Sequence, residues 1–214
     1  MRRVTADDDV TEVVTLAPER ELIVRRPRDA DALIDERAFA DDEFLPYWAE
    51  LWPSGVGLAR AIADRAWAGA PVVELGCGLG LPSVTAALGG ARVLATDWAT
   101  DSLAATQRTA ADNGAELQTL RVDWAVADEL VARGPFRAVL AADVLYEARN
   151  VPVLLELLPR LVAPGGELWL ADPGRASADA FFAGADAGWT RRTVAARGMP
   201  SVTIHRMRPV PSAT

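Results

Sequence analysis

The sequence predicts an α/β protein built on a doubly wound, seven-stranded sheet that is mostly parallel. From residue 71 onward, short runs rich in β-forming residues alternate with helical patterns, which is typical of parallel strands joined by crossover helices. A glycine-rich stretch, VVELGCGLGLPS (72–83), connects the first run to the first helix. Near the end of the chain, two runs are separated only by RGMP, and this short connection predicts an antiparallel hairpin at the edge of the sheet.

Seven runs in this region have the composition and length of strands. In chain order they are PVVEL (71–75), ARVLATD (91–97), LQTLRVD (117–123), FRAVLAAD (136–143), ELWLADP (167–173), WTRRTVAA (189–196) and SVTIHRM (201–207). A PGG turn precedes the fifth strand.

Helical patterns fill the intervals between the strands. The segment 80–90 has a proline in its first turn and a glycine stop, and further helices are expected at 150–162 and 177–186. The helix after the second strand is expected to take Thr100 as its N-cap and to stop at Asn113-Gly114. Its predicted buried positions are Leu103, Ala104, Ala110 and Ala111.

The first 45 residues differ from this pattern and are interpreted as a short N-terminal extension, with the main domain spanning 46–214. The stretch 11–27 predicts a small hairpin, and 29–44 predicts an acidic helix or loop. A helical pattern at 55–69 then leads into the first strand.

Composition excludes several classes of function. Thirty acidic residues against 22 basic ones give a net charge of −8, which disfavours binding to nucleic acid. No apolar run approaches the roughly 20 residues that cross a bilayer, and no apolar segment of a signal peptide follows the first arginines, so we expect a cytoplasmic protein without a membrane partner. One cysteine, Cys77, and one histidine, His205, supply neither a disulfide nor a usual zinc site, so no metal is expected.

The glycine-rich stretch could approach a dinucleotide, a nucleoside triphosphate or a ligand without phosphate. A triphosphate loop needs a lysine and then serine or threonine after its last glycine, but Leu81 and Pro82 follow Gly80. The dinucleotide fingerprint would require its third glycine at position 81. Asp97 ends the second strand and is placed to accept hydrogen bonds from both hydroxyls of a ribose. A dinucleotide and a phosphate-free nucleoside would both use this residue, so Asp97 does not distinguish between them.

The spacing of Glu74, Gly76, Gly78 and Gly80 resembles the E-x-G-x-G-x-G loop of class I S-adenosylmethionine (SAM)-dependent methyltransferases. The resemblance implies a Rossmann-like fold and SAM as the cofactor. SAM has no phosphate, so the loop need only pass its backbone over the methionine and ribose. Glu74 would fix the loop and could face the cationic end of the ligand.

A second motif narrows the resemblance. In AADVLYE (141–147), Asp143-x-x-Tyr146 resembles the D-x-x-Y motif of the seven-β-strand protein-lysine methyltransferases, the group that includes the enzyme acting on the electron-transfer flavoprotein β-subunit. The segment PYWAELWPSGVGLARAI (46–62) is also similar to that group. The matching segments run from about residue 44 to residue 172.

The resemblance implies a SAM-dependent N-methyltransferase that acts on a lysine side chain of a protein. Asp143 would hold the incoming ammonium, Tyr146 would orient it, and Trp48 and Trp52 could line the channel. The cofactor-binding residues that it implies are Trp52, Glu74, Gly76, Gly78, Gly80, Asp97, Trp98, Asp123, Trp124 and Ala142.

Two alternatives stay open at this point. The same acidic pocket could hold a small amine or pyridine acceptor, and the chain could instead be a SAM-binding regulatory protein without turnover. The acidic stretch DDEF (41–44) would steer a basic acceptor toward the site.

Overall fold

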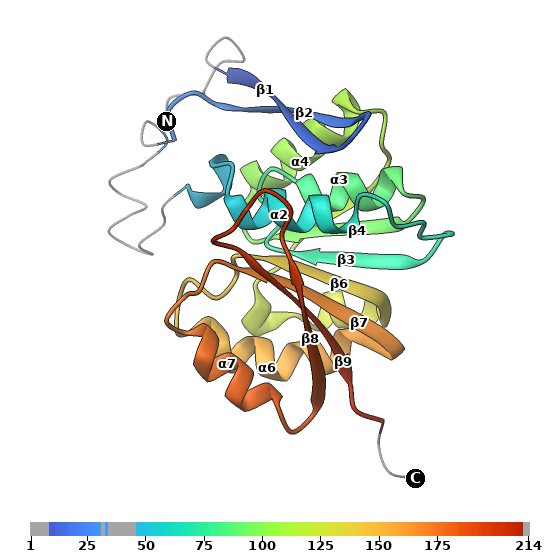
Figure 1. Cartoon of the computed structure of the whole chain (residues 1–214), viewed down its shortest axis with the longest axis vertical. Coiled ribbons are helices and arrows are strands. Elements are labelled where there is room, and N and C mark those ends of the chain that lie inside the picture. Colours follow the sequence, from blue (N-terminus) through green and yellow to red (C-terminus); the bar gives the residue numbers. More distant parts are fainter. Residues whose placement is uncertain (1–8, 31–32, 34–45, 212–214) are drawn as a thin grey trace.

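The computed structural model describes residues 9–30, 33 and 46–211 (Figure 1). Within these residues, one seven-stranded sheet lies between two layers of helices, and a separate two-stranded hairpin covers one of the helical layers (Figure 1). The strand order is β5-β4-β3-β6-β7-β9-β8. The predicted α/β class and the number of strands in the main sheet are confirmed.

The strands of the sheet follow the predicted runs closely. They are β3 (Pro71–Leu75), β4 (Arg92–Asp97), β5 (Gln118–Arg121), β6 (Phe136–Ala142), β7 (Val162–Asp172), β8 (Trp189–Ala195) and β9 (Thr203–Pro209). Strands β3 to β7 pair in parallel, whereas β9 is antiparallel to both β7 and β8. The predicted C-terminal edge hairpin is therefore confirmed.

The start of β7 differs from the prediction. The PGG sequence, expected as a turn before the strand, lies inside β7, which begins at Val162. The pairing of β6 with β7 shifts register between Phe136 and Ala138. This irregularity absorbs the extra residues, and Gly165 adopts a left-handed φ of 70° within it. The PGG residues, whose local sequence favours a turn, are thus part of a strand because β7 pairs with β6 on both sides of them.

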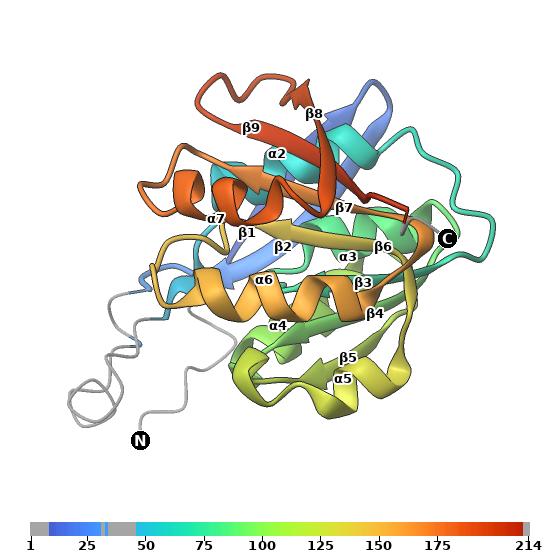
Figure 2. The ribbon, with the colours of Figure 1, turned by 90° about the horizontal axis from the view of Figure 1, so that it is seen from below.

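Six α-helices flank the sheet in the part of the chain that the structure describes. Helices α2 (Pro53–Ile62), α3 (Leu81–Leu88) and α4 (Thr100–Asp112) lie on one face, and α5 (Asp128–Arg133), α6 (Asn150–Leu161) and α7 (Ala178–Ala185) lie on the other (Figures 1 and 2). Alternate residues of the central strands enter separate apolar clusters on these two faces. None of the helices in the described ranges is long and apolar enough to span a membrane.

The predicted buried face of helix α4 is confirmed at Leu103 and Ala110 and is wrong at Ala104 and Ala111. The helix begins at Thr100 itself, and its N-cap residue Ala99 makes no side-chain capping bond. Ala104 is half-buried and Ala111 is exposed. The buried set is Ser102, Leu103, Ala105, Thr106, Thr109 and Ala110. Apolar periodicity misplaced this face because it gives no weight to small hydroxyl residues, which here pack toward a polar loop.

The N-terminal hairpin is confirmed as β1 (Asp9–Ala17) and β2 (Arg20–Pro27). Its inner side chains, among them Val14 and Leu22, share an apolar cluster with residues of α2, α3 and α4. The acidic segment predicted at 29–44 lies almost wholly outside the described residues.

Polar groups at the end of α4 also hold the hairpin. Arg25 binds both carboxylate oxygens of Asp112, at 2.7 and 2.6 Å. The side-chain amide of Asn113 accepts from the Ile23 N–H at 2.8 Å and donates to the Ile23 carbonyl at 2.7 Å, so it pairs with the strand as a neighbouring backbone would. The residue predicted as a helix stop therefore also docks the hairpin.

We expect Asn113→Ala to lower the free energy of unfolding by about 1–2 kcal/mol, because both bonds to Ile23 are lost. Urea denaturation measures the loss, and hydrogen exchange at the Ile23 amide localises it. Gln107→Ala is the matched control, since it removes an exposed side-chain hydrogen bond from the same helix. Unchanged exchange at Ile23 would show that the amide does not hold the strand.

Candidate functional site

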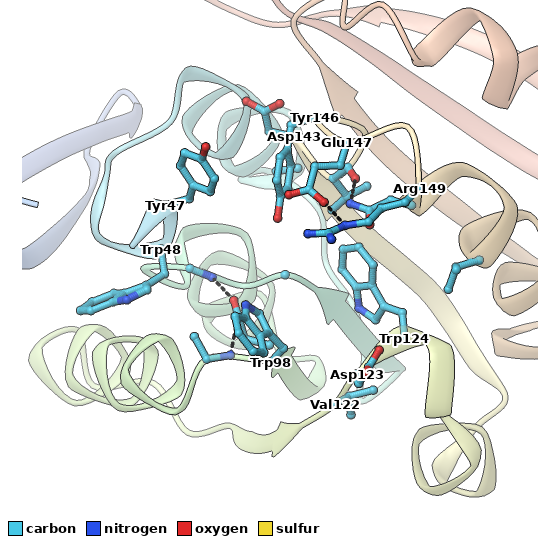
Figure 3. Close-up of a pocket in the computed structure, with 18 of the residues that line it drawn as sticks. Tyr47, Trp48, Trp98, Val122, Asp123, Trp124, Asp143, Tyr146, Glu147 and Arg149 are labelled. Atoms are coloured by element: carbon cyan, nitrogen blue, oxygen red, sulfur yellow. Dashed lines mark hydrogen bonds and ion pairs between the residues drawn. The ribbon is translucent and has the colours of Figure 1, made fainter. Parts of the chain in front are cut away.

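A cavity of about 660 Å³ opens at the carboxyl ends of β3, β4, β5 and β6 (Figure 3). Open parallel sheets bind ligands at this edge. The cavity is lined by ten of the twelve predicted site residues, namely Trp52, Gly76, Gly78, Asp97, Trp98, Asp123, Trp124, Ala142, Asp143 and Tyr146. The other two, Glu74 and Gly80, line a smaller pocket that shares Trp52, Gly76, Gly78 and Ala142 with the cavity.

The loop between β3 and α3 depends on its glycines. Gly76, Gly78 and Gly80 have φ values of 67°, 53° and 80°, a region that other residues rarely occupy. A Cβ atom at Gly80 would lie 2.7 Å from the side chain of Thr106. The Thr106 hydroxyl also donates to the Gly78 carbonyl at 3.0 Å, and the Ser102 hydroxyl lies 3.1 Å from the same carbonyl oxygen. The buried hydroxyls of α4 therefore fix the shape of the loop.

Glu74 stabilises the same loop by bonding to Ser83, in the first turn of α3. Its carboxylate is 1% exposed and accepts bonds from the Ser83 N–H, at 2.8 Å, and from the Ser83 hydroxyl. The side chain thus faces the first turn of α3. Burial, opposed by the two bonds from Ser83 and assisted by the charge of Asp97, raises the pKa of Glu74 to about 8.

Asp97 links β4, the loop and α4. One carboxylate oxygen accepts from the Ala99 N–H at 3.0 Å, and the other accepts from the Ser102 hydroxyl at 2.7 Å and the Gly78 N–H at 3.1 Å. The carboxylate is held in one orientation at the edge of the cavity. Lone pairs that these bonds leave unused can accept further hydrogen bonds from a ligand.

Asp123 and Trp124 follow β5 along the same edge. Asp123 caps a short 3₁₀ helix, η4 (Trp124–Val126), by accepting from the Ala125 N–H at 2.9 Å. The ring of Trp124 lies against Gly76, and Trp98, which is 43% exposed, lines the same cavity (Figure 3). Two indoles thus provide flat apolar surface for a ring system.

Aromatic side chains form the mouth of the cavity. The ring of Tyr47 lies 5.4 Å from that of Tyr146 and 6.2 Å from that of Trp52, and the Trp52 indole donates to the Tyr47 carbonyl at 2.7 Å. Burial and the charge of Glu147 raise the pKa of Tyr146 to about 12. The phenol therefore stays protonated at neutral pH and can donate a hydrogen bond.

The neighbouring Trp48 differs from the other aromatics. It contributes to the cavity lining, but its side chain packs against the apolar cluster shared with the hairpin, and Figure 3 shows its indole directed away from Tyr146. The sequence did not single out Tyr47, although it lies in the quoted PYWAELWP segment. The sequence shows the aromatic segment, but it does not show which of the aromatic side chains in that segment faces the cavity.

Asp143 has a strained backbone and a partner that the sequence analysis missed. Its φ is 58°, unusual for a residue with a side chain, and its carboxylate is 9% exposed. Both oxygens accept bonds from the Arg175 guanidinium, at 2.8 and 3.0 Å. Glu147 forms an ion pair with Arg149 at the same mouth (Figure 3). The only signal for Arg175 was its place just after the fifth predicted strand.

Arg175 is presented by a loop that Asp172 organises. Asp172 ends β7, and its carboxylate accepts from the backbone N–H groups of Gly174 and Arg175 at 2.7 and 2.9 Å. Burial raises the pKa of Asp172, and the nearby charge of Asp143 adds to this.

Among the described residues, no group of three potential metal ligands is present.

Residues 47–185 match the family described as lysine methyltransferase. The chain belongs to this family. It is 34% identical over 137 residues to the electron transfer flavoprotein beta subunit lysine methyltransferase of Xenopus laevis, covering 61% of this chain and 54% of that protein. It is 30% identical over 140 residues to the EEF1A lysine methyltransferase 3 of Mus musculus, covering 63% of this chain and 60% of that protein.

The matches thus span between half and two thirds of the length of these relatives. Among solved structures, the chain is similar to the N-methyltransferase NodS of Bradyrhizobium japonicum, solved in complex with S-adenosyl-L-homocysteine. The TM-score is 0.60 at 16% identity, and the match covers 86% of this chain and 98% of that one. This similarity confirms the predicted Rossmann-like fold.

The buried Glu74 makes stability depend on pH. The pKa of Glu74 is about 8 in the folded protein, against an ordinary value of 4.5. Between pH 4.5 and about pH 8, Glu74 is therefore protonated in the folded protein and ionised in the unfolded chain. Its contribution is complete below pH 4.5 and is lost as the pH rises through about 8. We expect this one group to lower stability by about 1.4 kcal/mol per pH unit in the window, and Glu74→Gln to remove that slope.

Urea unfolding at several pH values, compared between wild type and Glu74→Gln, measures the effect. Glu116→Gln, which removes an exposed carboxylate, is the control. Parallel pH profiles for wild type and Glu74→Gln would contradict a protonated Glu74.

Proposed function

We propose that the protein transfers a methyl group from SAM to the amine of a lysine side chain on another protein. The observation that supports this most directly is the juxtaposition of two features in one cavity. A glycine loop with carboxylates at neighbouring strand ends forms one side, and an acidic, aromatic mouth with Asp143 and Tyr146 forms the other.

The chemistry of the cavity fits a nucleoside that carries no phosphate. The loop has no lysine or arginine to hold a phosphate. Asp97 would accept from ribose hydroxyls, Asp123 from the adenine amino group, and Trp124 and Trp98 would cover the base. When bound, SAM supplies a methyl group activated on a sulfonium.

The chain's own residues would position the acceptor. Asp143 attracts the ammonium of the acceptor. After the ammonium loses its proton, the Tyr146 phenol oxygen can accept an N–H of the amine, which leaves the nitrogen lone pair free to attack, and the rings of Tyr47 and Trp52 line the path of the acceptor. Positioning of this kind and exclusion of water supply about 7–11 kcal/mol in intramolecular models. No covalent intermediate on the protein is required, and we assign no general base.

The family favours a protein acceptor over a small amine. The relatives reported above are named as lysine methyltransferases of the electron transfer flavoprotein beta subunit and of EEF1A. A protein with exposed lysines is the partner that a net charge of −8 would attract. The cytoplasm remains the proposed compartment, in keeping with a single cysteine.

Incubation of the purified protein with methyl-labelled SAM and a cell lysate tests this function. We expect label in macromolecules and, after acid hydrolysis, in Nε-methyllysine. Label confined to small products would favour the amine or pyridine acceptor. Binding of SAM without transfer to any acceptor would favour a regulatory role.

Asp97→Ala is expected to weaken SAM binding at least roughly tenfold, because it removes ribose acceptors and loosens the Gly78 N–H. Calorimetric titration with SAM measures the change. Asp101→Ala, an exposed residue in the first turn of α4, is the matched control. A wild-type dissociation constant in Asp97→Ala would remove Asp97 from the cofactor site.

Asp143→Ala should abolish methyl transfer while SAM affinity stays within about twofold of wild type, since the carboxylate faces the acceptor side. Transfer is followed with labelled SAM and binding by calorimetry, so the two effects separate. If SAM affinity falls in step with transfer, Asp143 belongs to the cofactor side of the cavity instead.

A further inference from the structure

The Arg175 guanidinium already occupies the surroundings proposed for a lysine ammonium. It is bonded to both oxygens of Asp143, and its central carbon lies 6.0 Å from the centre of the Trp52 ring. A carboxylate on one side and an aromatic ring on the other are the groups that bind an organic cation. Arg175 also lines the cavity.

While this pair is intact, Asp143 attracts a second cation weakly. The pair has no net charge. The guanidinium also bonds both oxygens of the carboxylate at once, which is the strongest arrangement for a cation beside Asp143. The side chain of Arg175 is 36% exposed, whereas that of Asp143 is 9% exposed. The guanidinium can therefore turn toward solvent, but the carboxylate has to stay.

The loop permits this movement without unfolding. The N–H groups of Gly174 and Arg175 are bonded to Asp172, so the backbone is anchored at the point where the side chain starts. Departure of the guanidinium would leave Asp143 near the buried Asp172 without its compensating cation. Two neighbouring carboxylates then favour entry of another cation.

We propose that Arg175 is a specificity-determining residue that fills the acceptor subsite as an internal cation and is displaced by the acceptor lysine. The proposal rests on the proposed function, because it takes Asp143 as the group that receives the acceptor. Exchange of one cation for another yields little net binding energy. A free amine therefore binds poorly, whereas a lysine on a protein gains affinity from contacts elsewhere on the surface.

The test uses N-acetyl-lysine methylamide as the probe and the full-length protein saturated with S-adenosylhomocysteine. Proton NMR of the probe's ε-methylene group reports binding beside the aromatic rings. We expect Arg175→Gln to bind the probe roughly tenfold more tightly than wild type, equal to about 1.4 kcal/mol. Arg175→Lys, which keeps a cation, should remain close to wild type.

Two controls isolate the subsite. Arg133→Gln makes the same charge change on α5, at a side chain that pairs with Glu129, and should not alter binding of the probe. The double variant Asp143→Asn/Arg175→Gln should lose the gain, because the gain requires the freed carboxylate. Urea denaturation of each variant confirms that it is folded.

Chemical rescue gives a readout that a purely structural role would not produce. Millimolar guanidinium chloride should refill the subsite of Arg175→Ala and weaken binding of the probe, with little effect on wild type. Equal affinity of wild type, Arg175→Gln and Arg175→Ala for the probe would overturn the proposal.

The outcome is independent of the methylation assay. If wild type methylates protein lysines but Arg175→Gln gains no affinity for the probe, the subsite proposal fails and the proposed function stands. If Arg175→Gln gains affinity although no acceptor is methylated, the cation subsite stands and the proposed function fails.

Discussion

The reversal of strand order at β3 is the constraint on which the site depends. Strand β3 pairs with β4 on one side and with β6 on the other, all in parallel, and the chain reaches these neighbours over opposite faces. The connections therefore diverge at the carboxyl ends of the strands and leave a crevice there. Strands β4, β5 and β6 each deliver one carboxylate to this edge, from Asp97, Asp123 and Asp143, and the loop after β7 adds Arg175.

The crevice also explains how much of the site the sequence could predict. Asp97, Asp123 and Asp143 come directly at or after parallel strands, so their gathering at one edge follows from the strand pattern alone. The glycine loop is equally local, since its spacing is set by three left-handed backbone positions. These features could be predicted because each is decided within a few residues of the chain.

Features decided by distant contacts could not be predicted. Arg175 and Asp143 are 32 residues apart, and their pairing depends on the loop that Asp172 shapes. Likewise, the hydroxyls of Ser102 and Thr106 are buried against Asp97 and the Gly78 carbonyl, contacts that no apolar pattern on α4 reveals. The polar interior of a binding loop is specified by hydrogen bonding across elements.

The N-terminal hairpin is joined to the site by packing. Leu79 and Leu81, inside and just after the glycine loop, belong to the same apolar cluster as the inner face of the hairpin, and Trp48 packs against that cluster from the mouth. The hairpin therefore supports the loop from behind. The N-terminal extension, which the sequence predicts as separate, shares an apolar core with the helices that carry the glycine loop.

Charge balance imposes a further demand on methyl transfer to an amine. An ammonium held by Asp143 is not a nucleophile, and a lone carboxylate opposes loss of its proton. If Arg175 is displaced only as far as the adjacent solvent, it can pair with Asp143 again as the ammonium gives its proton to water. That return would offset the lost ammonium contact and so favour the neutral amine. The same residue that excludes free amines would then help the acceptor become reactive, which requires that Arg175 stay tethered beside the mouth by the Asp172 loop.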